Sequence, residues 1–218
     1  LQPDRVLVGT ESEEAREIMA LLYKPLTAQG AALLQTDVRT AELTKYAANA
    51  FLATKIAFIN EIADICEKVG ANIEQLADGI GSDHRIGRKY LSPGPGFGGS
   101  CFPKDTLALR KIGRESGAPT NVVEAVVDSN DNRKIAMAEK IIAANDGEVF
   151  CKNIALLGLA FKANTDDMRE SPALAIVPAL RKAGAHIRAY DPEAMEQARN
   201  ELGDEETTWC SSAYEALE

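Results

Sequence analysis

The segment Ser92–Asp105, SPGPGFGGSCFPKD, joins a loop rich in glycine and proline to a cysteine and two charged residues. Such a loop lets the backbone approach a ligand closely, and its successive N–H groups can bind an anion. Cys101 follows the loop and precedes a predicted helix with Pro103 in its first turn. A thiol at a helix N-terminus beside Lys104 favours the thiolate, which is the nucleophilic form. Cys101 is therefore a candidate nucleophile. The alternative is a small buried structural thiol, which is our interpretation of Cys66, Cys151 and Cys210.

Positive charge gathers around this loop. The stretch from residue 84 to residue 104 contains no acidic residue and four cations, Arg85, Arg88, Lys89 and Lys104. A local basic region in an acidic chain favours an anionic ligand, and a diphosphate is the natural candidate. The alternative is a solvated, charged turn.

A second group of polar residues lies in an apolar stretch. Lys45 and Asn49 are four residues apart, so they share one face of a helix, and Asn60 returns to that face eleven residues later. Such residues are costly to bury without partners, and they could donate hydrogen bonds to a developing oxyanion. The alternative for Lys45 is a surface cation that extends into solvent.

The third segment, GLAFKANTDDMRES at 158–171, follows a predicted buried strand. In open α/β sheets, ligands bind beyond the carboxyl ends of the strands, where Phe161 and Lys162 would lie. This loop lacks the Gly-x-Gly-x-x-Gly spacing of a dinucleotide site. Residues 164–167 could instead form a helix-capping turn.

The elements that must position these residues follow from hydrophobic periodicity and from glycine and proline positions. Residues 40–69 contain no glycine or proline, which predicts one helix of about 45 Å. The middle of the chain is otherwise helical, whereas strands flank it at both ends, and residues 152–192 form a β-α-β unit of a parallel sheet. We predict strands at 5–9, 31–38, 152–161 and 186–192, and helices at 11–23, 40–69, 73–80, 103–116, 119–130, 132–144, 171–185 and 193–202. Asn130 or Asp131 would cap the helix at 132–144.

Composition excludes several classes of protein. The 218 residues include 24 Lys and Arg against 33 Asp and Glu, a net charge of −9, which argues against nucleic-acid binding by the whole chain. No run of eighteen apolar residues predicts a membrane span, and the first ten residues do not resemble a signal peptide. Four cysteines without a Cys-x-x-Cys pair favour a reduced, cytoplasmic protein. With two histidines, no metal site is expected.

Three segments, AELTKYAANAFLATKIAFINE at 41–61, GFGGSCFPKD at 96–105 and GLAFKANTDDMRES at 158–171, together resemble the UDP-glucose/GDP-mannose dehydrogenase family. Members of this family oxidise the C6 alcohol of a nucleotide sugar to a carboxylate with NAD. The form GGSCFPKD is more similar to the branch that acts on UDP-glucose, which implies UDP-glucuronate as product. The resemblance runs over essentially the whole chain.

The resemblance implies a role for each matching residue. Cys101 would be the nucleophile, with Lys45, Asn49 and Asp105 as the polar catalytic group. NAD would contact Cys101, Lys104 and Arg169. The nucleotide sugar would be held by Lys45, Asn49, Ser92, Gly94, Phe97, Gly98, Phe161 and Lys162, and Arg85 would reach the substrate of a neighbouring subunit in a homodimer.

The resemblance also implies an α/β fold in three parts. Residues 1–38 would end an N-terminal NAD-binding Rossmann domain, 39–147 would form a long helix with an all-helical dimerisation domain, and 148–218 would form a Rossmann-like UDP-sugar domain that is incomplete. Because the glycine-rich cofactor loop of the family is not recognised at 1–38, we expect this chain alone not to form NADH. Two alternatives remain: an enzyme for GDP-mannose or UDP-N-acetylmannosamine, and a non-catalytic helical dimerisation module.

Overall fold

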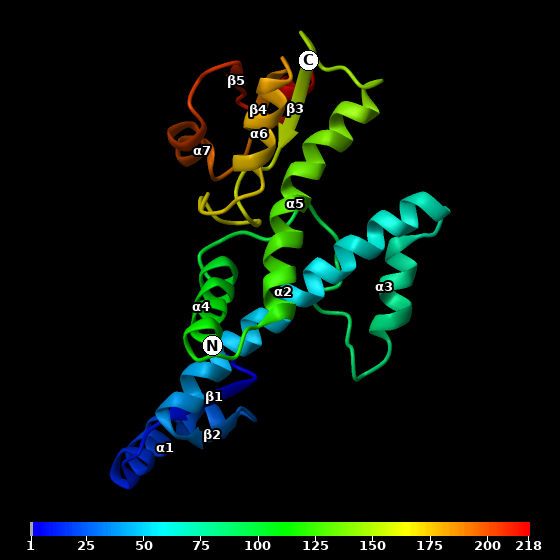
Figure 1. Ribbon diagram of the computed structural model, residues 1–218. Helices are drawn as coiled ribbons and strands as arrows, with labels where there is room; N and C mark the ends of the chain where they lie inside the picture. The colour runs from blue at the N-terminus through cyan, green and yellow to red at the C-terminus, as the bar shows by residue number, and fades with distance from the viewer. Residues whose placement is uncertain (1) are drawn as a thin grey trace. The chain divides into compact units, whose positions relative to one another are not determined.

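The computed structural model describes residues 2–218 as a mixed α/β chain (Figure 1). The chain divides into two compact units, one ending at Asn49 and one beginning at Ala50, and each is described by itself. Both contain a parallel sheet and helices, which confirms the predicted α/β class. The predicted domain boundaries after residues 38 and 147 stay predictions.

The first unit holds a β-α-β arrangement. Strands β1 (Arg5–Gly9) and β2 (Ala32–Thr36) pair in parallel, with Leu7 opposite Leu34, and α1 (Glu13–Thr27) connects them. The Ser12 hydroxyl accepts the Ala15 N–H at 3.2 Å, so Ser12 caps α1. The predicted end of this helix at residue 23 is wrong, since α1 continues through Pro25.

The longest helix, α2 (Val38–Val69), confirms the stretch predicted from the absence of glycine and proline. In the second unit its apolar side packs against α3 (Ile73–Gly81). Ile59, Ala77 and Leu91 are buried together there, so the residue that precedes the glycine-rich loop is anchored in a core.

Two further helices follow the loop. Helix α4 (Phe102–Glu115) begins directly after Cys101, and α5 (Asn121–Ala144) continues without a break. The two helices predicted at 119–130 and 132–144 are therefore one, and neither Asn130 nor Asp131 is a cap. The physical reason is that Asn130 faces inward, 5% exposed, where its side chain bonds to another segment.

The remaining residues form a three-stranded parallel sheet in the order β3 (Asn153–Leu157), β4 (His186–Tyr190) and β5 (Thr207–Trp209). Its helices are α6 (Ala173–Lys182), α7 (Met195–Leu202) and α8 (Ala213–Leu217). Helix α6 packs on β4, and α8 packs on β3 and β4. The predicted β-α-β unit corresponds to β3, α6 and β4, and the helix predicted at 193–202 corresponds to α7. Strand β5 and helix α8 are not among the predicted elements.

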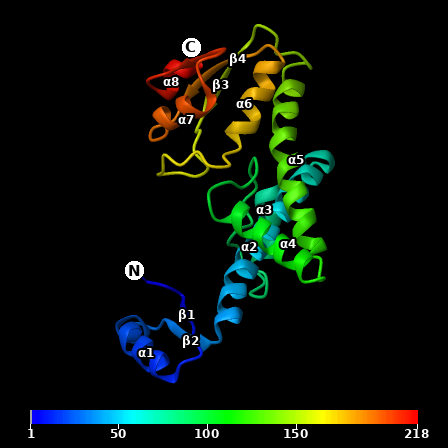
Figure 2. The same ribbon diagram turned by 60° about the vertical axis from the view of Figure 1, so that its left-hand side comes forward.

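Helix α5 belongs to two parts of the second unit. Its C-terminal half runs beside α6, and Ala138 joins the core of the three-stranded sheet with Leu159 and Leu180 (Figure 2). Its N-terminal half faces the glycine-rich loop through Val126 and Asn130. Of the helices within residues 2–218, none is long and apolar enough to cross a lipid bilayer.

Candidate active site around Cys101

The glycine-rich loop is held by side chains of α2 and α5. Asn60 Oδ1 accepts the Gly94 N–H at 2.8 Å, and Arg133 Nε donates to the Gly94 carbonyl at 3.0 Å. Arg133 is in turn paired with Asp64 at 2.5 Å. Because both backbone groups of Gly94 are bonded, the loop has a fixed position against these two helices.

Phe97 is the buried centre of the loop. The residue is 7% exposed, and its ring meets the ring of Phe102 edge-on, with centroids 5.9 Å apart. Asn130 Oδ1 accepts the Phe97 N–H at 2.7 Å, and Asn130 Nδ2 donates to the Phe97 carbonyl at 3.1 Å. Phe97 and Phe102 bracket Cys101 in sequence, so their packing fixes the backbone on both sides of the thiol.

Two glycines lie against the loop that follows β3. A Cβ on Gly98 would be 2.3 Å from the Glu170 carbonyl oxygen, and a Cβ on Gly99, where φ is +81°, would be 2.6 Å from the Phe161 ring. The Gly99 N–H donates to the Arg169 carbonyl at 2.7 Å. These positions need glycine because another backbone and a ring occupy the space of a side chain.

The sequence of this loop also matches the dinucleotide fingerprint, since Gly94, Gly96 and Gly99 have the Gly-x-Gly-x-x-Gly spacing. That motif requires a strand before the glycines and a helix directly after them. Here the segment lies between α3 and α4 with no strand before it. The loop is therefore not a dinucleotide fingerprint.

Cys101 lies at the N-terminal end of α4, as predicted, and it is exposed. Its carbonyl accepts the Asp105 N–H at 2.9 Å, which is the first hydrogen bond of the helix. Asp105 is 2% exposed and one helical turn from the thiol, and its carboxylate lies 3.4 Å from Lys104 Nζ. The structure thus brings Cys101, Lys104 and Asp105 together on the first turn of α4.

Arg169 lies beside this turn on the β3–α6 loop. Its guanidinium pairs with Asp167 at 2.7 Å and is 68% exposed. The hydrogen-bonded Asp167 carboxylate and, to a smaller degree, the charge of a Cys101 thiolate raise the pKa of Arg169. In return, Arg169 lowers the pKa of Asp167 to about 2. Two exposed cations, Lys104 and Arg169, therefore flank Cys101.

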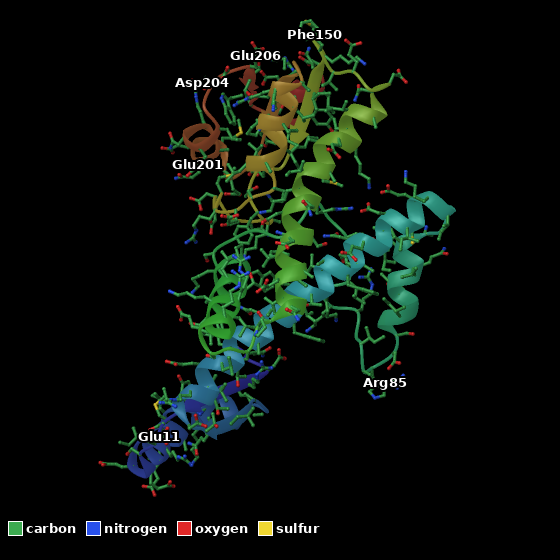
Figure 3. All side chains as sticks on the ribbon, in the orientation of Figure 1. Glu11, Arg85, Phe150, Glu201, Asp204 and Glu206 are labelled. Carbon is green, nitrogen blue, oxygen red and sulfur yellow. The ribbon has the colours of Figure 1, made fainter. Side chains whose placement is uncertain are left out.

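The predicted basic region is less positive than its sequence indicates. Arg85 forms a bidentate pair with Asp83, and Arg88 pairs with Glu74 at 2.7 Å and with Asp78 at 2.6 Å. The three carboxylates lie outside residues 84–104, so two of the four cations of this region are paired with acidic residues from the preceding segment. Arg85 is exposed and points away from the rest of its unit (Figure 3).

The carboxyl end of β3 carries the predicted ligand loop. Phe161 lines a cavity of about 480 Å³ between this end of the sheet and α5, together with Gly96, Leu159 and Ser171. Lys162 Nζ lies 5.3 Å from the centroid of the Phe161 ring. The Phe161–Lys162 pair therefore lies near the glycine-rich loop, which contributes Gly96 to the same cavity.

Asp191, directly after β4, fixes the start of this loop. Its carboxylate accepts the N–H groups of Leu159 at 2.7 Å and Ala160 at 3.1 Å, and two further N–H groups at the start of the next segment. Burial would raise its pKa, but the four backbone donors outweigh burial and the pKa of Asp191 lies below its usual value.

Two of the predicted catalytic residues belong to the first unit. Lys45 is exposed and Asn49 is 7% exposed, and both lie on α2. Their place beside Cys101 stays a prediction. Of the other cysteines, Cys66 and Cys210 are buried as predicted, whereas Cys151 is exposed, so the interpretation of Cys151 as a buried thiol is wrong.

The sequence reasoning missed three residues that organise the site: Asn130, Arg133 and Asp191. The sequence favours Asn130 as a helix cap because asparagine is common at that position. A usable signal existed for Asp191, because an acidic residue that ends a parallel strand faces the end of the neighbouring strand. Nothing in the local sequence indicates that Asn130 bonds to a residue 33 positions away.

The fold and the site define an α/β protein with parallel, Rossmann-like strands and an exposed cysteine between a glycine-rich loop and a helix. Two domain models of one family match most of this chain. The central domain of the UDP-glucose/GDP-mannose dehydrogenase family matches residues 39–132, and its UDP binding domain matches residues 155–218. The chain belongs to this family.

Individual proteins named as UDP-glucose dehydrogenases are also similar to this chain. The chain is 57% identical over 200 residues to a UDP-glucose 6-dehydrogenase of Rhizobium meliloti, which covers 91% of the chain and 46% of that protein. It is 47% identical to the UDP-glucose 6-dehydrogenase TuaD of Bacillus subtilis, over 99% of the chain and 46% of that protein. The structure of a UDP-glucose dehydrogenase from Pyrobaculum islandicum matches with a TM-score of 0.92 and 38% identity, over 99% of the chain and 49% of that protein. The chain spans about half the length of the relatives it matches.

Proposed function

We propose that this chain carries the catalytic cysteine and the nucleotide-sugar site of an NAD-dependent UDP-glucose 6-dehydrogenase. The observation that carries the proposal is Cys101, an exposed thiol at the start of α4 on a loop whose backbone is bonded from two sides. The names of the relatives support UDP-glucose as the substrate.

The chemistry explains why a thiol is needed. The first oxidation converts the C6 alcohol to an aldehyde, whose carbon is trigonal. A second hydride can leave only from a tetrahedral carbon that bears an oxyanion, so a nucleophile must first add to the aldehyde. The Cys101 thiolate adds to the C6 aldehyde, a C–S bond forms, and the carbonyl oxygen takes the electron pair as an oxyanion. Oxidation of this adduct leaves a thioester, and water then breaks the C–S bond to release the carboxylate and the thiol.

Three polar residues complete this step. Lys45 and Asn49 are proposed to donate hydrogen bonds to the oxyanion, which develops only as the thiolate adds. Asp105 is proposed to orient the water that cleaves the thioester. Its position supports this role, since it is buried one helical turn from Cys101.

NAD is the proposed cofactor, and when bound it would accept the hydride of each oxidation. The residues beside Cys101 fit an anionic cofactor, because Lys104 and Arg169 are 74% and 68% exposed. Lys104 and Arg169 would bind it through charge, and Cys101 is the third proposed contact.

The nucleotide sugar would lie between the glycine-rich loop and the end of β3. Phe161 and Gly96 line one cavity there, which supports this placement. The proposed contacts are Lys45, Asn49, Ser92, Gly94, Phe97, Gly98, Phe161 and Lys162.

A homodimer through the central helices is part of the proposal. Phe51, Phe58 and Ile65 are spaced seven residues apart on α2, so they share one face, and they are 67%, 49% and 55% exposed. An apolar stripe of this kind favours a partner helix. Arg85, exposed on its loop, would reach the substrate bound to the other copy.

Alkylation distinguishes an enzyme from a non-catalytic module. We expect iodoacetamide to label Cys101 faster than Cys151, which is also exposed and therefore serves as an internal control. Peptide mass spectrometry measures both rates in one sample. Equal rates would contradict the nucleophile and favour the module.

Calorimetry distinguishes the possible substrates. We expect the chain to bind UDP-glucose more tightly than GDP-mannose or UDP-N-acetylmannosamine. Tighter binding of either alternative would move the proposal to another member of the family.

A further inference from the structure

We propose that Asn130 is a positioning residue for the Cys101 thiol, which rests on the function proposed above. Asn130 lies on α5, 29 positions after Cys101, and the residue is 5% exposed. Its side-chain amide bonds to the backbone of Phe97. It acts through the backbone of Phe97.

The contact between Asn130 and Phe97 is bidentate. The amide oxygen accepts the Phe97 N–H at 2.7 Å while the amide nitrogen donates to the Phe97 carbonyl at 3.1 Å. The Asn130 amide thus bonds both the N–H and the carbonyl of Phe97, as a residue of a neighbouring strand does in a sheet. Both bonds are buried, so losing the amide leaves two unsatisfied backbone groups.

The loop is shaped to receive this amide. Gly96 has φ +120°, and a Cβ there would be 3.1 Å from Asn130 Oδ1 and 3.1 Å from Lys134 Cγ. Lys134, one turn after Asn130, is 8% exposed and pairs with Glu170 at 3.4 Å. The backbone of Glu170 in turn lies against Gly98. Successive turns of α5 therefore hold both sides of the segment that leads to Cys101.

The consequence for Cys101 follows from the short distance along the chain. Three residues separate Phe97 from Cys101, and the Phe97 ring packs against Phe102 on the other side of the thiol. If the Phe97 backbone shifts, the start of α4 shifts with it. A displacement of about 1 Å at a reacting group can cost about a hundredfold in rate.

The test compares Asn130→Ala and Asn130→Asp with Asn132→Ala, a matched control because Asn132 is an exposed asparagine on the same helix. Iodoacetamide labelling of the 218-residue chain is followed at each cysteine by mass spectrometry. We expect Asn130→Ala to slow labelling of Cys101 about tenfold, with Cys151 unchanged and with Cys66 and Cys210 still protected. Asn130→Asp keeps the acceptor for the Phe97 N–H, so it should slow labelling of Cys101 less than Asn130→Ala does.

A second readout separates positioning from general stability. In a polypeptide that joins this chain to a complete dinucleotide-binding domain, Asn130→Ala should lower kcat about tenfold or more, with KM for UDP-glucose within about twofold. Unchanged labelling of Cys101 in both variants would overturn the inference. Labelling of Cys66 and Cys210 in both variants would also overturn it, because Asn130 would then support the fold as a whole. If the proposed function is wrong, the result is different: in the wild-type chain, iodoacetamide labels Cys101 no faster than Cys151.

Discussion

At the scale of single residues, the environment of Cys101 combines exposure with a fixed backbone. The thiol is open to solvent, whereas Phe97, Gly98 and Gly99 before it and Asp105 after it are buried. An exposed group on a rigid support is what covalent catalysis requires, because the nucleophile must meet its substrate in one geometry. The other exposed thiol, Cys151, lies before strand β3 and does not begin a helix.

Replacing Cys101 by serine tests this role. In a polypeptide joined to a complete dinucleotide-binding domain, Cys101→Ser should abolish net formation of the carboxylate, since a hydroxyl is a poor nucleophile near neutral pH. UDP-glucuronate is measured by chromatography. Cys151→Ser is the control and should retain wild-type turnover, and an unchanged kcat in Cys101→Ser would remove the thiol from the mechanism.

The Lys45 ammonium group is the second single-residue feature with a testable role. If its ammonium group stabilises the oxyanion, Lys45→Ala should lower kcat by about 10²–10³-fold and raise KM less. Initial rates over a range of UDP-glucose concentrations give both constants. Lys55→Ala is a control on the same helix, since Lys55 donates to the carbonyls of Ile86 and Gly87. A change in KM alone would make Lys45 a binding residue.

At the scale of elements, the sequence predicts helices and strands well where the pattern is local. The long helix α2 and the strands β1 to β4 follow from periodicity and from the positions of glycine, whereas the short strand β5 does not. The break predicted at Asn130 fails because a capping preference is a local statistic, whereas the Asn130 side chain is committed to Phe97. The same limit applies to Arg88, whose partners Glu74 and Asp78 lie on α3.

Two glycines of the loop provide a matched pair for the contact with the β3–α6 loop. A Cβ at position 98 would overlap the Glu170 backbone, whereas one at position 94 would meet nothing within 4 Å. Gly98→Ala should therefore lower the free energy of unfolding by about 1–3 kcal/mol, and Gly94→Ala should change it little. Urea denaturation measures both, and equal effects would contradict the close packing of these loops.

The ion pair between Asp167 and Arg169 on the β3–α6 loop predicts that the stability of the fold depends on pH in the acid range. Arg169 lowers the pKa of Asp167 from 3.8 to about 2, so the pair stabilises the fold above pH 3.8 and this contribution is lost as the pH falls towards 2. Arg169→Ala should return the pKa of Asp167 towards 3.8, as measured by NMR titration of the carboxyl carbon. Arg199→Ala is the control, because Arg199 holds Asp204 instead. An Asp167 that still titrates near 2 without Arg169 would show that its backbone hydrogen bond suffices.

At the scale of the whole molecule, the proposed dimer gives the exposed stripe on α2 a function. Fully burying an aromatic or aliphatic side chain contributes about 1.5–3 kcal/mol, so the stripe of Phe51, Phe58 and Ile65 could stabilise an association of two copies. The proposed role of Arg85 gives the same association a catalytic purpose, since each substrate would then depend on both copies.

Phe58→Glu tests the dimer and the shared site together. A carboxylate in the middle of the stripe should convert the dimer to a monomer at micromolar concentration in sedimentation velocity, because a buried, unpaired charge is costly. The same variant should weaken UDP-glucose binding in calorimetry, because it removes the partner's arginine from the site. Tyr214→Glu is the control: Tyr214 is 83% exposed on α8, so this change should alter neither measurement. A wild-type monomer would contradict the dimer, and a monomeric Phe58→Glu that binds UDP-glucose as tightly as wild type would contradict the shared site.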